Sequence, residues 1–174
     1  NVFLSLIPGE SGFIVATDCN FNGLASKPVT DKDIVEPITG EWNVYFDPKW
    51  GGPGEIRFTE LTDWTKHANQ GIRYYSGTAV YRKTLNLSTP ASGEQWLLRF
   101  PHLGSMARIR LNGHEINTVW CSPWESDLTP YIKEGENTLE IEVVNSLMNR
   151  MIGDVVLSQD KRYTYAFPEI VAAK

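Results

Sequence analysis

The sequence predicts an all-β fold in which antiparallel strands form a sandwich. Short segments that alternate apolar and polar residues recur along the chain, and turns rich in Gly, Pro, Asn and Asp separate them. No segment longer than about ten residues has the apolar spacing near 3.6 that an amphipathic helix requires. At 174 residues, the chain is long enough for one domain with a sizeable core.

The clearest strands surround a predicted hairpin near the middle of the chain. Ala107–Leu111 alternates apolar and charged residues, which is typical of a strand with one buried face. Asn112-Gly113 follows, and this dipeptide readily adopts the positive φ angles of a two-residue hairpin turn. The segment His114–Trp120 then returns as the second strand.

The chain after this hairpin is predicted to complete the sheet. Asp127–Lys133 indicates a short helical turn, and Gly135–Asn137 indicates a tight turn into a strand at Thr138–Val143. In that strand the apolar residues share one face and the glutamates share the other: Leu139, Ile141 and Val143 against Glu140 and Glu142.

Elements before and after this region follow the same pattern. Four more strands are expected, at Gly40–Phe46, Glu55–Phe58, Tyr74–Leu87 and Gln95–Phe100. Strand alternation places Trp42 and Trp96 toward the core. Four apolar residues are expected to face inward from one irregular turn, namely Leu147, Met148, Met151 and Ile152. Tyr163–Phe167 is expected to form a final edge strand.

The first residues differ from the rest of the chain. Asn1–Thr17 contains two apolar runs joined by a Pro-Gly turn, and residues 18–38 are polar without a regular period. We therefore expect residues 1–38 to be a hairpin and linker left from a preceding domain. Because the chain begins abruptly at Asn1, we also expect it to be a fragment of a longer protein.

Composition excludes several classes of function. The net charge of −5 gives no basic stripe that would neutralise phosphates, so we expect no nucleic-acid partner. No apolar run approaches the roughly 20 residues of a membrane helix, so we expect no membrane partner. Cys19 and Cys121 lie too far apart in sequence to indicate a metal cluster, and whether they pair is left open. The three histidines show no metal-binding spacing, so no metal site is assigned.

Several motifs carry a family resemblance. The central stretch resembles the jelly-roll, galactose-binding-like domain of glycoside hydrolases, notably the sugar-binding domain of the β-galactosidase and β-glucuronidase group, through Leu111-Asn-Gly113, Asp127-Leu-Thr129 and Lys133-Glu-Gly-Glu-Asn137. Other segments resemble the C-terminal domain of α-L-rhamnosidase-type enzymes: Gly40–Pro53, Tyr74–Lys83 and Asn149–Asp154. The resemblance implies that residues 39–174 form a galactose-binding-like β-sandwich.

The resemblance also implies a biological setting. In the related enzymes this domain does not contain the catalytic carboxylate pair, so we expect this chain to be non-catalytic and to contact the catalytic domain of the same parent chain. A periplasmic or secreted polysaccharide-degrading system is implied. We expect no cofactor, although some related domains hold a structural calcium, for which Asp127 and the loop at Asp47 are the candidate ligands here.

Loop aromatics are the candidate carbohydrate-binding residues. A sugar ring offers polarised C–H groups on its faces and hydroxyls at its rim, so its site requires aromatic planes with polar groups nearby. The candidates on or beside loops are Trp50, Trp64, Trp120 and Trp124, and each could instead plug an end of the sandwich or pack against another domain. Asn149 and Arg150 are added because they match a family motif and follow the last core strand.

Three functions remain open at this point. The first is an accessory domain that binds glycan weakly, or braces the catalytic domain of a larger glycoside hydrolase, with bracing preferred. The second is a self-sufficient hydrolase that uses a carboxylate pair on the Trp50 and Trp124 loops. The third is a protein–protein adhesion module, which would show an apolar patch of several hundred Å².

Overall fold

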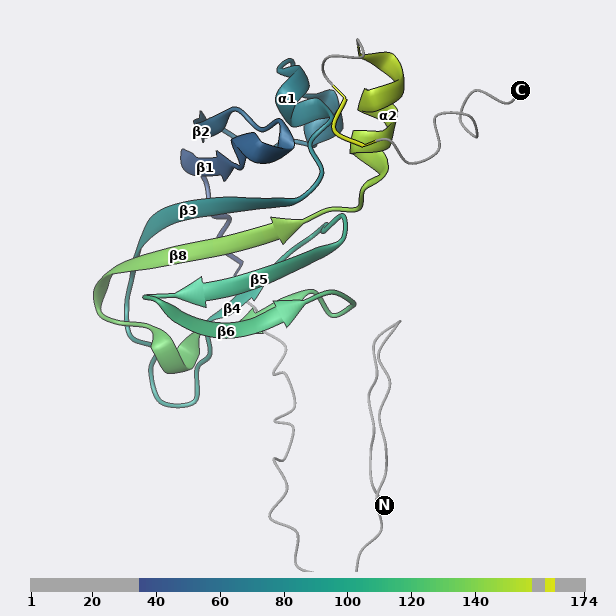
Figure 1. Ribbon diagram of the computed structural model, residues 1–174. Helices are drawn as coiled ribbons and strands as arrows, with labels where there is room; N and C mark the ends of the chain where they lie inside the picture. The colour runs from purple at the N-terminus through teal and green to yellow at the C-terminus, as the bar shows by residue number, and fades with distance from the viewer. Residues whose placement is uncertain (1–34, 158–161, 165–174) are drawn as a thin grey trace, which may run out of the picture.

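The computed structural model describes residues 35–157 and 162–164, and its strands pair in two antiparallel sheets (Figure 1). The larger sheet has the order β2 (Gly54–Phe58), β1 (Trp42–Phe46), β3 (Thr78–Leu87), β8 (Gly135–Val144), β5 (Met106–Leu111), β6 (His114–Val119). The smaller sheet pairs β4 (Leu97–Arg99) with β7 (Glu125–Asp127). The prediction of an all-β fold is confirmed.

Short helices fill the connections. They are η1 (Pro48–Trp50), η2 (Trp64–Lys66), α1 (Gln70–Arg73), η3 (Thr129–Tyr131) and α2 (Met148–Val156). The predicted helical turn in 127–133 corresponds to η3 and is confirmed. No helix within the described ranges is long and apolar enough to span a bilayer.

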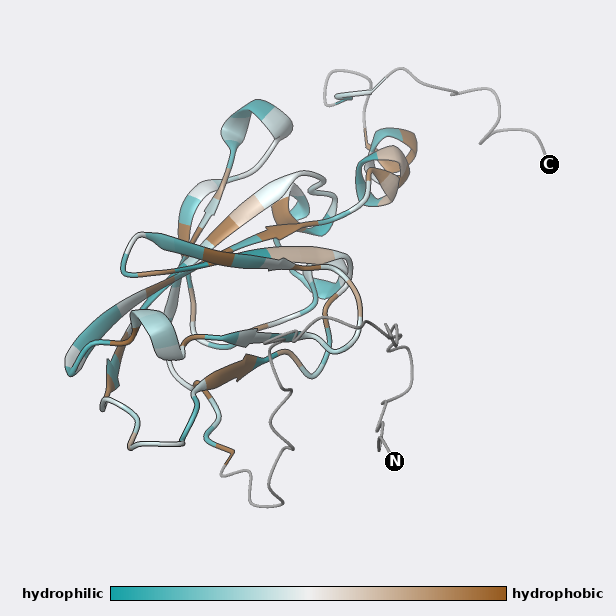
Figure 2. Ribbon diagram, turned by 90° about the horizontal axis from the view of Figure 1, so that it is seen from below, coloured by the Kyte–Doolittle hydropathy of each residue, from teal (hydrophilic) through white to brown (hydrophobic). Residues whose placement is uncertain are grey.

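The core lies against the inner face of the large sheet. Strand alternation turns one set of side chains inward, so Val44, Ile109 and Leu139 are fully buried. The predicted inward position of Trp42 is confirmed, and Trp96 packs against the same core. The small sheet helps to cover this face with the buried Leu98 and Ser126 (Figure 2, where brown and teal alternate along the strands).

The predicted hairpin is confirmed, and one of its side chains connects it to the neighbouring strand. Asn112 and Gly113 have φ angles of 53° and 81°, and Leu111 pairs directly with His114. The Asn112 amide donates to the side-chain oxygen of Asn137 over 2.8 Å. Asn137, predicted in a turn, is instead a fully buried residue of β8, because its amide group also bonds the backbone of Lys133 and Gly135.

Two other predictions differ from the structure. The strand expected from Tyr74 begins at Thr78, because α1 ends at Arg73 and the Tyr75 hydroxyl donates to the carbonyl of Thr78. The chain after β8 forms helix α2, and its residues expected to face inward are exposed or partly exposed, so that prediction was wrong. The predicted first hairpin and linker, and most of the predicted edge strand at 163–167, lie outside the described residues.

Strand register brings several loops to one end of the large sheet, here called the loop end. Phe46, Ala79, Val143, Ala107 and Val119 form one cross-strand row near this end. Beyond the row lie the η1 loop, the turn before β3, the chain entering α2, the loop before β5 and the loop after β6. Helix α2 accordingly stands beyond the ends of the strands in Figures 1 and 2.

Charged side chains cover the outer face of the same sheet. Arg82 faces Glu140 across the β3–β8 pair, and Arg108 faces Glu142 across β5–β8. Their ion pairs measure 2.7 Å and 3.3 Å, and Arg110 contacts both glutamates. Opposite charges directly across a sheet stabilise the pairing of strands that are already in register.

Candidate functional site

Trp64 is part of the core and not of an exposed surface. It is 9% exposed, and its indole N–H donates to the Tyr81 hydroxyl over 2.6 Å. Its ring packs edge-on against Phe46 and Tyr75. Burial raises the pKa of Tyr81 to about 12, and the hydrogen bond from Trp64 acts in the opposite direction. Trp64 therefore offers no ring face to a ligand.

Trp50 and Trp120 are both exposed at the loop end. Trp50 ends η1, whose first turn is capped by the Asp47 carboxylate, and it is 51% exposed. Trp120 directly follows β6 and is 69% exposed. The two belong to opposite sides of the cross-strand row, separated by four strand spacings of about 4.8 Å each. They therefore cannot stack on the same sugar ring.

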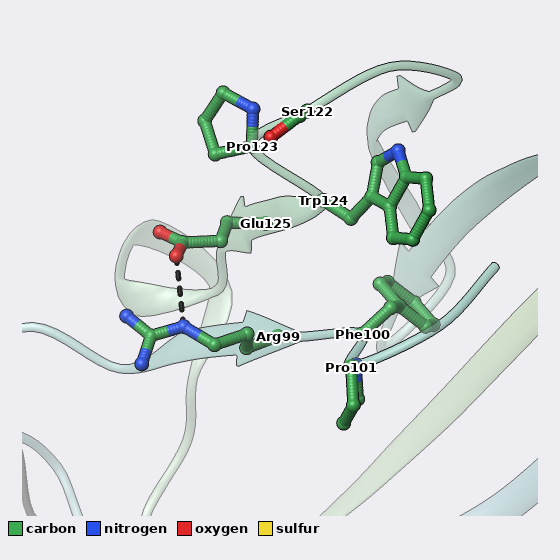
Figure 3. A pocket seen from close by; sticks show the side chains of 7 residues that line it. All are labelled: Arg99, Phe100, Pro101, Ser122, Pro123, Trp124 and Glu125. Atoms are coloured by element: carbon green, nitrogen blue, oxygen red, sulfur yellow. Dashed lines mark hydrogen bonds and ion pairs between the residues drawn. The ribbon is translucent and has the colours of Figure 1, made fainter. Parts of the chain in front are cut away.

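A shallow groove of about 380 Å³ lies between residues 99–101 and residues 122–125 (Figure 3). Phe100, Pro101, Pro123 and Trp124 line it, and the ion pair between Arg99 Nε and Glu125 Oε1, at 2.8 Å, closes one side. Trp124 is mostly buried against the core, and its indole N–H has no hydrogen-bond partner in the described part of the chain. The groove thus combines aromatic and proline surface with charged groups at its rim.

Arg150 is buried and anchors helix α2. Its side chain is 3% exposed, and its Nε lies 3.0 Å from the Asp154 carboxylate. The Tyr163 ring lies over its guanidinium group, 4.9 Å from the ring centroid. Its backbone N–H donates to the Ser76 hydroxyl over 2.9 Å. The backbone of Arg150 therefore ties the helix to the sandwich, and its side chain does not extend toward a ligand. Asn149, the other candidate binding residue of this segment, is partly exposed.

The outward face of α2 is the surface that sequence reasoning missed. Its exposed apolar residues are Met148 at 59%, Ile152 at 48%, Val155 at 50% and Val156 at 64%. The buried residues of the helix are Arg150, Gly153 and Asp154. The spacing of three and four residues between Arg150, Gly153 and Asp154 indicates from the sequence that they share one face of a helix.

In the described part of the chain, every carboxyl group whose pKa departs clearly from its ordinary value has a lowered pKa. Hydrogen bonds from Thr65 lower the pKa of Asp63, and those from Thr89 lower that of Glu134. Desolvation raises the pKa values of Glu140 and Asp154, but their hydrogen-bond donors and arginine partners lower both overall. A general acid of glycoside hydrolysis needs a raised pKa.

The two calcium candidates serve the local backbone. One carboxylate oxygen of Asp47 accepts from the Lys49 N–H, and one of Asp127 accepts from the Thr129 N–H, each at 2.9 Å. No group of three or more His, Cys, Asp or Glu side chains is placed to hold a metal ion in residues 35–157 and 162–164. Cys121 is exposed, and whether it pairs with Cys19 stays open because Cys19 lies outside those ranges.

Comparison with known proteins defines the family. Residues 62–158, more than half of the chain, match the model of the galactose-binding domain-like family of glycosyl hydrolase 2. The chain belongs to this family. The resemblance predicted from the sequence motifs is thereby confirmed, and so is the galactose-binding-like fold.

Relatives of this galactose-binding-like domain are much longer proteins. A Formosa agariphila protein named "Putative beta-glucuronidase" is 38% identical over 135 residues, which cover 75% of this chain and 12% of that protein. The structure of a rhamnosidase from Novosphingobium sp. PP1Y matches with a TM-score of 0.71 and 31% identity, covering 75% of this chain and 12% of the other. An uncultured Clostridium sp. β-glucuronidase shares the fold at a TM-score of 0.51 and 24% identity, covering 62% of this chain and 21% of the other.

Proposed function

We propose that this chain is a non-catalytic, carbohydrate-associated accessory domain of a larger glycoside hydrolase, and that it mainly braces a neighbouring domain of the same polypeptide. The observation that carries the proposal is where its exposed apolar side chains lie. Most of the large ones lie at the loop end, on Trp50, Met106, Trp120, Leu147 and the outward residues of α2, while Val35, Tyr45, Leu61 and Leu97 are exposed elsewhere. The outer face of the sheet instead bears charged pairs and suits solvent.

Two further observations support this role. The match covers only 12% of the Formosa and Novosphingobium proteins, so such relatives have ample chain to form a neighbour. The downward pKa shifts of the displaced carboxyl groups also favour a non-catalytic domain over a self-sufficient hydrolase. The relatives' names suggest rhamnosides and glucuronides as substrates of the parent enzyme, which we propose to be rhamnosidase-like and periplasmic or secreted.

Deletion of this domain from the complete gene product tests the bracing role. We expect the enzyme without residues 35–164 to unfold at lower temperature and to lose activity as it unfolds. Calorimetry and aryl-glycoside hydrolysis measure the two effects, with the intact protein as the reference. An enzyme that kept its melting temperature and its activity after the deletion would refute bracing. Aryl-glycoside turnover by the 174-residue chain alone would instead favour the self-sufficient hydrolase.

Weak glycan binding is the second candidate function, and the groove lined by Phe100 and Trp124 favours it. The groove carries aromatic surface from Phe100 and Trp124 and an Arg99–Glu125 rim, which is the combination a pyranose ring requires. The exposed Trp120 lies two residues before the groove residue Ser122 in the sequence. An NMR titration with rhamnose, galactose, glucuronate and pectic oligosaccharides tests it. Saturable shifts of the Trp120 and Trp124 indole signals would establish binding, and unchanged spectra at millimolar sugar would exclude it.

A further inference from the structure

Helix α2 is inverted relative to an ordinary surface helix. Successive residues of an α-helix are about 100° apart, so Arg150, Gly153 and Asp154 point to one side, and Met148, Ile152 and Val155 point to the opposite side. In a surface helix the apolar side is buried. Here the charged side is buried and the apolar side is exposed.

Specific contacts fix the helix in this orientation. Asp154 accepts hydrogen bonds from the backbone N–H groups of Tyr163 and Thr164, at 3.1 Å and 2.7 Å, while it pairs with Arg150. A Cβ atom on Gly153 would lie 2.6 Å from Cβ of Tyr74, so only glycine allows the helix this close to the sandwich. Rotation of the helix to bury its apolar side would break the hydrogen bond between the Arg150 N–H and Ser76 and would move Gly153 away from Tyr74. It would also expose the Arg150–Asp154 pair, which lies within the helix.

The chemistry of the outward face indicates what covers it. The only charged residues of α2 are Arg150 and Asp154, and both face inward. The outward face therefore offers a partner only apolar and uncharged side chains. A surface of this kind loses contact with water most favourably against another apolar surface.

The size of the face argues against a second copy of this chain as the partner. Stable interfaces between separate proteins use about 20–30 residues on each side, and α2 has nine residues. A domain in the same polypeptide needs less surface, because the linkage keeps its local concentration high. Relatives that extend far beyond the matched region have chain for such a domain.

We infer that the outward face of α2 is an intramolecular docking surface, which takes an apolar, uncharged patch of the adjoining domain. This inference rests on the proposed bracing role and names its contact. The Arg150–Asp154 pair, Ser76 and Tyr163 position the helix, and Met148, Ile152, Val155 and Val156 make the contact.

The test replaces two outward residues in the complete gene product, as Ile152→Glu with Val156→Lys. These positions are four residues apart, and Glu before Lys at this spacing favours the helix itself, so the domain stays folded. Leu61→Glu is the matched control, since Leu61 is 59% exposed and lies in the loop after β2, away from the loop end. We expect limited proteolysis to release the doubly substituted domain about tenfold faster than the wild type, and Leu61→Glu to leave the rate unchanged.

A photo-crosslinking residue at position 152 identifies the partner directly. We expect an intramolecular cross-link to one apolar peptide outside the 174 residues of this chain, and no such product from position 61. A cross-link between two copies, or an unchanged release rate, would overturn the docking surface and leave the bracing role to the deletion experiment. A mature gene product no longer than this chain would overturn the bracing role as well.

Discussion

The six-stranded sheet and helix α2 expose opposite chemistry to solvent. On the sheet, apolar side chains such as Ile109 and Ile141 face the core, and charged ones such as Arg82 and Glu140 face out. On α2 the charged Arg150 and Asp154 are buried, and the apolar residues face out. Both elements contain arginine–carboxylate pairs, and the contrast comes from whether the pairs are exposed or buried.

This difference separates a solvent-facing surface from a contact surface. An exposed ion pair gains little free energy, because water solvates its charges well without the partner. A buried pair has already lost its hydration, so each charge depends on the other. The sheet therefore does not need its charges to fold, whereas α2 depends on them for its orientation. An orientation that exposes apolar residues in this way supports the proposed docking surface.

Removal of Arg150 is expected to have the largest effect. Arg150→Met would leave Asp154 buried with only its backbone and Thr164 donors, and we expect a loss of about 3–5 kcal/mol in the free energy of unfolding. Arg82→Met, at a pair that is 49% and 24% exposed, is the matched control, with an expected loss of about 1 kcal/mol or less. Urea denaturation of the 174-residue chain measures both.

A double-mutant cycle separates the energy of each ion pair from the packing energy of its side chains. Arg150→Met is combined with Asp154→Asn, and Arg82→Met with Glu140→Gln. We expect the buried pair to show the larger coupling energy. Equal coupling energies for the two pairs would contradict the comparison between the sheet and the helix.

A fall in pH is expected to destabilise the sheet through Glu140. The expected loss of stability lies between those of Arg150→Met and Trp120→Ala. Although desolvation raises the pKa of Glu140, hydrogen bonds from Arg82 and Arg110 lower it overall in the folded chain. A carboxyl group with a lowered folded-state pKa stabilises the fold above its unfolded pKa of about 4.3, and this stabilisation is lost as pH falls through the folded value.

Glu140→Gln should therefore remove a pH-dependent part of the stability. We expect the variant to be less stable than the wild type at pH 6, and the two to converge as the pH falls below about 4. Urea midpoints at pH 6, 4 and 3 provide the measurement, and Glu136→Gln on the same strand is the control. A stability difference that stayed constant over this range would show that Glu140 acts by packing alone.

Patterns with a local physical cause made most of the fold predictable from the sequence. Strand alternation located β1 and the inward residues of β8, and the Asn112-Gly113 turn set the hairpin register. Loop composition alone did not decide exposure among the tryptophans. Trp64 and Trp120 both border strands or loops, yet only Trp64 finds a hydroxyl partner in the core, from Tyr81.

Helix α2 could not be predicted from the usual rule that apolar residues face inward. That rule assumes that the chain buries its own apolar surface, and here the buried positions are charged residues with partners elsewhere in the sequence. Ser76 and Tyr163 stand 74 and 13 residues from Arg150, so no local pattern shows that they meet it. The spacing of Arg150 and Asp154 indicates that they share a helix face, but only the structure shows that this face is buried.

Trp120→Ala is expected to have the smallest effect on stability. Its side chain is 69% exposed, so we expect a change within about 0.5 kcal/mol in the free energy of unfolding of the isolated chain. The same substitution should remove any glycan-induced NMR shifts if Trp120 takes part in sugar binding, and leave them if the sugar binds elsewhere. A loss above about 1 kcal/mol would show that Trp120 packs within this chain, so the loop end would present less apolar surface to a neighbour. The exposed face of α2 would then have to account for the contact alone.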